Sequence, residues 1–192
     1  ASFFNSLLSI SLSGQETSSS PHTLVIKNVN VIPMTGQGIL NGQSVVIRDG
    51  KIIELGPHKT IETPEGATII EGKGKYLLPG ISEMHAHIPI AQDGDDTKVR
   101  DVLFLYLSNG ITTIREPGSF NGLDWVMDHK KRSDNNIIVA PRIVPYVGFG
   151  LGWDKTIYTP KQARKWVKYI AKQGAKGIKF FGATPKIMEA AL

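Results

Sequence analysis

The sequence predicts an α/β protein in which a small β-sandwich domain precedes a barrel-type unit. Residues 23–80 form short strand-like runs, whereas strand and helix patterns alternate over residues 81–192. The repeated β-α-β-α order predicts a parallel sheet with right-handed crossovers. Four such units make the first half of a (β/α)8 TIM-type barrel, and an open four-stranded α/β sheet is the alternative that periodicity leaves open.

The amino-acid composition restricts which functional groups and which partners the chain can have. The 192 residues are 41% hydrophobic with a net charge of +5, and they include no cysteine. Disulfides, thiolate metal sites and cysteine nucleophiles are therefore excluded, so a metal would need histidine, carboxylate or modified lysine ligands. No apolar run is long enough to span a membrane. The basic residues are not interleaved with aromatic residues on which bases could stack, so we predict no nucleic-acid partner.

The two ends of the chain differ in sequence character from the regions that form the fold. Residues 1–22 combine an apolar, uncharged stretch with a Ser/Thr-rich tract, as in a signal peptide that lacks its basic start. This predicts an exported protein, periplasmic or secreted; a plain disordered leader and a cytoplasmic protein are the alternative. At the other end, Thr184-Pro185 begins a helix in which the chain stops, so we expect a truncated chain.

The strands of the first region are predicted from β-branched and alternating residues. Asp49-Gly50 between two such runs is a strong hairpin signal. The predicted strands cover residues 24–32, 44–48, 51–55 and 67–71.

The second region alternates strands with amphipathic helices. Gly110 suits the position after a helix, and Thr159-Pro160-Lys161-Gln162 has the spacing of a capping box that begins another. The predicted strands are 81–87, 111–115, 142–147 and 178–181, and the first two predicted helices are 96–109 and 123–132.

The sharpest motif is His85-Ala86-His87, at the C-terminal end of the first barrel-type strand. Residues i and i+2 of a strand point to the same face, so both imidazoles can bind one divalent ion such as zinc. Barrel enzymes keep their active sites at this end of the strands. The alternative is a pair of half-exposed histidines at a strand end.

The segment Leu78–His87 resembles the signature of the amidohydrolase superfamily. The spacing to Gly110–Glu116 and to Gly177–Phe181 is similar to the imidazolonepropionase-like or Xaa-Pro dipeptidase-like branch. The resemblance covers residues 23–192. The chain departs from the pattern at Glu83 and Glu116, where the family usually has Asp, and the first change bears on the support of the metal.

The resemblance implies a (β/α)8 barrel with two divalent ions, zinc being the expected metal. His85 and His87 would bind one ion, and a carboxylated Lys179 would be a catalytic residue that bridges to the second. Further histidine ligands, an aspartate and the strands that complete the sandwich are expected beyond Leu192. The alternative for Lys179 is a strand-end lysine that reaches solvent.

Two more residues are candidates for substrate binding. The glycine-rich segment 148–154 predicts a substrate-lining loop with Trp153 as a wall, or else a structural turn. Arg115, at the end of the second barrel-type strand, could bind a substrate carboxylate through its forked guanidinium. Its alternative is a pair with Glu116 or another local carboxylate.

Together these features predict an enzyme, a metal-dependent hydrolase that cleaves an amide-type C–N bond by metal-activated hydroxide. Dipeptides or N-acyl amino acids are the expected substrates, and the chain on its own is expected to be inactive. One alternative is a mononuclear cyclic-amide hydrolase or deaminase of the same superfamily. Another is an inactive relative that acts as a binding or assembly module. A homo-oligomer is left open.

Overall fold

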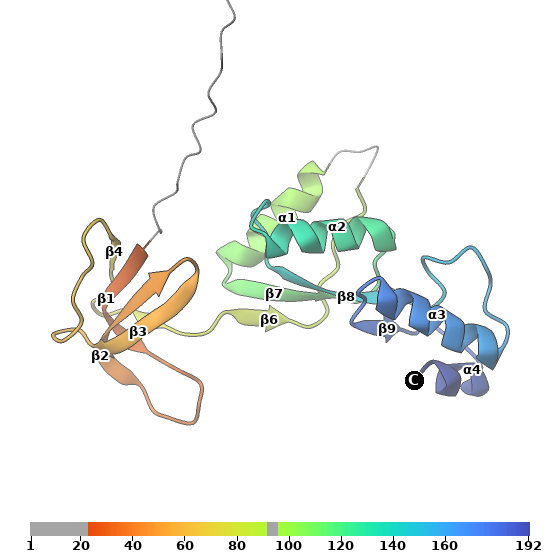
Figure 1. Ribbon diagram of the computed structural model, residues 1–192, viewed down its shortest axis with the longest axis horizontal. Coiled ribbons are helices and arrows are strands. Elements are labelled where there is room, and N and C mark those ends of the chain that lie inside the picture. Colours follow the sequence, from red (N-terminus) through yellow and green to blue (C-terminus); the bar gives the residue numbers. More distant parts are fainter. Residues whose placement is uncertain (1–22, 92–95) are drawn as a thin grey trace, which may run out of the picture. The chain divides into compact units, whose positions relative to one another are not determined.

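The computed structural model describes residues 23–91 and 96–192, and the chain divides between Pro79 and Gly80 into two compact units. Figure 1 shows the first unit as strands alone and the second as strands alternating with helices. The leader expected at residues 1–22 lies outside the described residues.

The first unit is a five-stranded sheet in the order β3-β2-β1-β4, with β5 pairing β1 as well. β1 is antiparallel to β2 but parallel to β4 and β5, which follow each other along the same edge of β1. Its strands are β1 (Thr23–Val31), β2 (Leu40–Arg48), β3 (Lys51–Pro57), β4 (Thr68–Glu71) and β5 (Tyr76–Leu77).

The hairpin between β2 and β3 confirms the turn predicted from the sequence. Asp49 has φ 50° and Gly50 has φ 73°, so both central residues are left-handed. Such a turn matches the twist of the flanking strands, and Asp-Gly adopts it at low cost. The hairpin brings Arg48 opposite Lys51.

The core of this unit is small. Val29, Val31 and Val45 are buried together, whereas β4 is exposed along its whole length. The described part of the unit is this one sheet, so the second layer of the sandwich stays a prediction.

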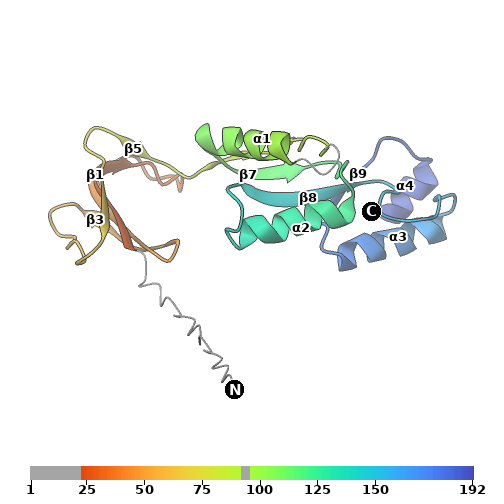
Figure 2. The same ribbon diagram turned by 90° about the horizontal axis from the view of Figure 1, so that it is seen from above.

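The second unit is a four-stranded sheet in the order β6-β7-β8-β9, and all its neighbouring strands are parallel. Helices follow the strands one by one along the chain, which confirms the predicted half of a barrel (Figures 1 and 2). The elements are β6 (Ile81–Glu83), α1 (Thr97–Ser108), β7 (Ile111–Glu116), α2 (Leu123–Asp134), β8 (Arg142–Gly148), α3 (Pro160–Lys172), β9 (Gly177–Lys179) and α4 (Pro185–Ala191).

One face of this sheet is covered by helices. Ile114 of β7 lies opposite Ile143 of β8, and Val147 lies opposite Ile178 of β9. These side chains pack with residues of three helices: Val99 and Leu103 of α1, Leu123 and Val126 of α2, and Trp166 and Ile170 of α3.

The other face of the sheet bears polar residues. Alternation along each strand directs Arg115, Tyr146 and Lys179 away from the helices, since their neighbours Ile114, Val147 and Ile178 face them. In a closed barrel this face is the interior, and its C-terminal edge is the place of the active site.

The third helix begins as its sequence predicts. The Thr159 hydroxyl accepts a hydrogen bond from the Gln162 backbone N–H at 3.3 Å, and the Gln162 side chain accepts one from the Thr159 N–H at 3.0 Å. Pro160 occupies the first helical position. The reciprocal bonds satisfy amides that a helix start otherwise leaves unpaired.

Two strands end earlier than predicted. β6 ends at Glu83 because the Glu83 carboxylate accepts a hydrogen bond from the His85 N–H at 2.8 Å, where the backbone turns. β9 ends at Lys179, whose carbonyl accepts the Phe149 N–H at 2.8 Å where β8 has just ended. Phe181 therefore lies beyond its strand.

Candidate functional site

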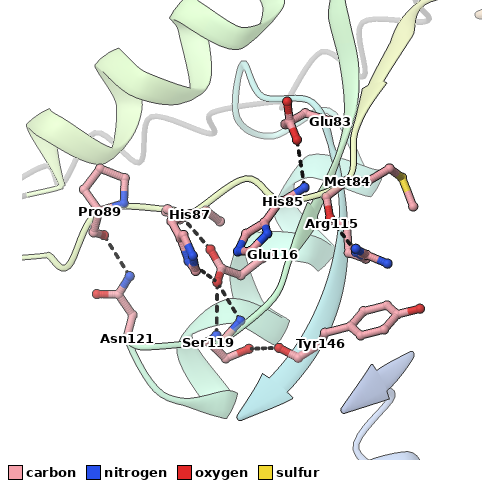
Figure 3. A network of polar contacts seen from close by, with 12 residues as sticks. Glu83, Met84, His85, His87, Pro89, Arg115, Glu116, Ser119, Asn121 and Tyr146 are labelled. Carbon is pink, nitrogen blue, oxygen red and sulfur yellow. Dashed lines mark hydrogen bonds and ion pairs between the residues drawn. The ribbon is translucent and has the colours of Figure 1, made fainter. Parts of the chain in front are cut away.

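The two motif histidines lie side by side at the C-terminal edge of the parallel sheet. They follow β6 rather than lying on it, which corrects the predicted strand 81–87. The Ala86 N–H still donates to the Arg115 carbonyl at 3.1 Å, so pairing with β7 continues past the strand end. The rings of His85 and His87 are 5.1 Å apart between centroids, in an edge-to-face arrangement (Figure 3).

Behind the histidines lies the carboxylate of Glu116, which is 2% exposed. Its Oε2 accepts the Ile88 N–H at 2.6 Å, and its Oε1 accepts the N–H groups of Gly118 at 2.9 Å and Ser119 at 3.2 Å. These three bonds join the segment after β6 to the loop after β7. Burial of this charge is thus offset by strong hydrogen bonds from the backbone.

The same carboxylate faces the second histidine. Oε1 of Glu116 lies 3.6 Å from Nδ1 of His87, whose side chain is 46% exposed. A carboxylate beside Nδ1 favours a proton on that nitrogen and leaves Nε2 as the metal-binding atom. His87 thus offers an imidazole to a metal ion, and the Glu116 carboxylate lies on the other side of that ring.

Two further side chains connect the loops around this site. Asn121 accepts the Ala91 N–H at 2.8 Å and donates to the Pro89 carbonyl at 2.8 Å. The Ser119 hydroxyl donates to the Tyr146 carbonyl on β8 at 3.0 Å (Figure 3). The loops after β6 and β7 are therefore held to each other and to β8.

Electrostatics at this edge also affect a helix residue. Burial and the nearby carboxylates of Glu83 and Glu116 raise the pKa of Tyr106 on α1.

Arg115 takes another partner than the one weighed for it from the sequence. Its Nε donates to the Met84 carbonyl at 2.6 Å, and its guanidinium carbon lies 5.0 Å from the centre of the Tyr146 ring. Within the described residues it forms no ion pair with Glu116, which points to the opposite side of the strand. The guanidinium group thus lies over the Tyr146 ring.

Lys179 lies half-buried at the C-terminal end of β9, opposite Gly148 of β8. It shares the helix-free face with Arg115 and Tyr146, and it lies at the same edge of the sheet as the histidines. No hydrogen bond or ion pair joins its side chain to His85, His87 or Glu116 in the part of the chain that the structure describes.

Trp153 lies against the helices. Its ring centre is 6.4 Å from that of Tyr169 on α3, and it packs on the helix-side core. The loop is tied to the same helix because Trp166 Nε1 donates to the Leu151 carbonyl at 2.9 Å. The aromatic ring beside the histidines is instead Phe120, whose centre is 5.4 Å from that of His87.

Sequence reasoning missed the roles of Glu116, Asn121 and Phe120. From the sequence, Glu116 is a departure from the family pattern and a possible partner of Arg115, although an acidic residue at the end of a barrel strand is itself a signal. The other two lie in a loop whose sequence has no periodicity.

Comparison with known proteins identifies the group to which the chain is related. No protein-family model matches it. Over 103 residues it is 31% identical to an adenine deaminase of Rubrobacter xylanophilus, an alignment that covers 54% of this chain and 17% of that enzyme. Such matches indicate the amidohydrolase superfamily, each over only part of the relative's length.

Solved structures share the fold of this chain. The match to a molinate hydrolase covers 89% of this chain and 50% of the hydrolase chain, with TM-score 0.74 at 16% identity. The match to a Xaa-Pro dipeptidase with bound methionine covers 82% of this chain and 46% of the dipeptidase chain, with TM-score 0.63 at 18% identity. The chain thus spans about half the length of these structures.

The described residues fit one part of a metal centre. No cluster of three or more His, Asp or Glu side chains is arranged to hold an ion within residues 23–91 and 96–192. His85 and His87 nevertheless present adjacent imidazoles with a buried carboxylate behind one of them. No helix in the described ranges is long and apolar enough to cross a membrane.

Proposed function

We propose that the protein bearing this chain is a metal-dependent hydrolase of an amide-type C–N bond, with dipeptides or N-acyl amino acids as substrates. The observation that supports this best is the adjacent pair His85 and His87 with Glu116 at Nδ1 of His87. The likeness in fold to a Xaa-Pro dipeptidase agrees with the proposed substrates.

His85 and His87 would hold one divalent ion, for which zinc is our proposal. When bound, such an ion supplies Lewis-acid chemistry to a carbonyl and lowers the pKa of water. The chain itself orients the ligands. The Glu83 carboxylate fixes the backbone at His85 through the 2.8 Å bond, and the Glu116 carboxylate lies 3.6 Å from Nδ1 of His87.

Arg115 would bind the carboxylate of the substrate. Its Nε is engaged by the Met84 carbonyl, and this bond together with the Tyr146 ring orients the guanidinium plane. The two Nη groups can then form a forked pair with a carboxylate. Replacing Arg115 with Lys should raise KM for substrates with a free carboxylate and leave KM for their amidated analogues unchanged.

Lys179 would be carboxylated and bridge to a second ion. Its place at the end of β9, on the helix-free face, supports this role. The loop that bears Trp153 would border the substrate region, whereas the Trp153 ring itself lies against Tyr169.

The second candidate is a mononuclear cyclic-amide hydrolase or deaminase, which the likeness to an adenine deaminase favours. Lys179 separates the two. In the dipeptidase-like case Lys179→Ala should reduce the metal content from two ions per chain to one. In the mononuclear case the variant should retain the single ion and the rate of the wild type.

The deciding experiment measures metal in the full-length protein by elemental analysis. His85→Ala and His87→Ala should each lose most bound metal and the hydrolysis of a dipeptide panel. His58→Ala is the matched control, since His58 lies in the other unit. Wild-type metal content in either site variant would refute the assignment.

A further inference from the structure

Two large aromatic side chains lie exposed beside the histidine pair. Phe120 is 48% exposed and Phe181 is 64% exposed. The ring centre of Phe120 lies 5.4 Å from that of His87 and 6.1 Å from that of Phe181. With His85, 5.1 Å from His87, four rings form a continuous row along the C-terminal edge of the sheet.

The backbone under this row leaves room for both phenylalanines. A Cβ on Gly118 would lie 2.8 Å from Cε2 of Phe120, and a Cβ on Gly148 would lie 3.0 Å from Cε2 of Phe181. Real Cβ atoms need more space than this, so glycine at both positions lets each ring lie against the main chain. Gly148 belongs to β8, which ends beside Lys179 of β9.

The loop that bears Phe120 is firmly held. Ser119 has φ 54°, a conformation that costs a non-glycine residue energy and persists only where its surroundings require it. Here the Ser119 N–H donates to Glu116 and its hydroxyl donates to the Tyr146 carbonyl. The ring of Phe120 is thus positioned by the same carboxylate that faces His87.

Exposed aromatic side chains on a fixed backbone favour an apolar ligand group. Ring faces attract other apolar groups because contact removes both surfaces from water. The two rings contact each other, and Phe120 also contacts the ring of His87, so an apolar group bound there would lie directly beside the histidine pair.

We propose that Phe120 and Phe181 form the subsite for an apolar group of the substrate, an aryl or branched aliphatic substituent next to the bond that is cleaved. The proposal rests on the proposed function and specifies it. The two rings select the substrate, whereas the histidines and Lys179 act on the bond.

The test compares two substrates that differ only in this group, N-acetyl-L-phenylalanine and N-acetylglycine, in the full-length protein. The wild type should favour the aryl substrate in kcat/KM. Phe120→Ala and Phe181→Ala should each reduce that preference by about tenfold, a change typical of a hydrophobic pocket that loses a contact. Phe120→Leu should restore much of it, because leucine keeps an apolar surface.

Phe104→Ala serves as the control, since Phe104 is 59% exposed on α1 and lies outside the row of rings. Dissociation constants of the two compounds, measured by NMR titration, give a readout that needs no turnover. They should show the same loss of preference in the Phe120 and Phe181 variants and none in Phe104→Ala.

The outcomes separate the two proposals. If the wild type binds the aryl compound preferentially and the variants lose this preference while neither compound is hydrolysed, the subsite stands and the proposed function fails. If both compounds are hydrolysed but the preference is absent in the wild type or unchanged in both alanine variants, the subsite is overturned and the hydrolase remains.

Discussion

Replacing Glu116 with glutamine tests the centre of the site with almost no change in shape. The glutamine oxygen can still accept the N–H groups of Gly118 and Ser119. Its NH2 group then faces the Ile88 N–H, which now donates to Oε2 at 2.6 Å, so two donors meet and the negative charge is lost. The substitution therefore acts on the connection between the two loops.

The expected loss of stability follows from the hydrogen bonds that Glu116 accepts. A hydrogen bond to a charged group contributes about 1.5–3 kcal/mol, and a buried donor left without a partner costs a similar amount. We expect Glu116→Gln to lower the local stability of the loops by about 2–3 kcal/mol. Glu116→Ala leaves three amides without their acceptor and should cost about 3–5 kcal/mol, in the range of exceptional single substitutions.

Hydrogen exchange of the backbone amides is the appropriate assay, because it reports local opening. A loss of 2 kcal/mol makes exchange about 30-fold faster, since each 1.4 kcal/mol is a factor of ten. The amide of Ile88 should show this change in Glu116→Gln, and those of Gly118 and Ser119 a smaller one. Glu189→Gln, the same change at an exposed position on α4, should stay within about 0.5 kcal/mol of the wild type.

Metal affinity gives a second measurement on the same variants. A supporting carboxylate typically contributes 10–100-fold to the affinity of a histidine site, and we expect about this loss in Glu116→Gln. Unchanged exchange at Ile88 together with unchanged metal affinity would refute the role assigned to Glu116.

Three further predictions concern other parts of the barrel unit. Thr159→Ala removes the hydroxyl of the capping box and should lower the free energy of unfolding by about 1 kcal/mol in a denaturant titration; an equal loss in Ser108→Ala, which lacks this role, would contradict it. Gly177→Ala places a Cβ against the Tyr146 ring and should cost about 1–3 kcal/mol by the same measurement. The raised pKa of Tyr106 means that the folded state holds the phenol proton more tightly than the unfolded state does, so its contribution to stability is full below the ordinary tyrosine pKa and is lost as pH rises through the folded value. Tyr106→Phe should therefore lose less stability than the wild type in alkaline denaturation curves, and parallel curves would show that the shift has no effect on folding.

Local and periodic features of this fold could be predicted from the sequence. The Asp49-Gly50 hairpin depends on two adjacent residues that tolerate left-handed φ, and the capping box at Thr159 depends on groups three residues apart. The order of strands and helices followed from hydrophobic periods. The sequence also predicted that His85 and His87 lie at the C-terminal edge of the sheet, although they follow β6 and do not lie on it as their spacing suggested.

The tertiary structure alone determined how the site is supported. The end of β6 depends on where the Glu83 side chain turns, and the role of Glu116 depends on Ile88, which is 28 residues away. The aromatic neighbour of His87 is Phe120 because strand pairing brings the loop after β7 next to the segment after β6, while Trp153 lies against α3. Hydrogen bonds and ring contacts between distant segments leave no period in a sequence, because they depend on the positions that the whole sheet gives to its loops.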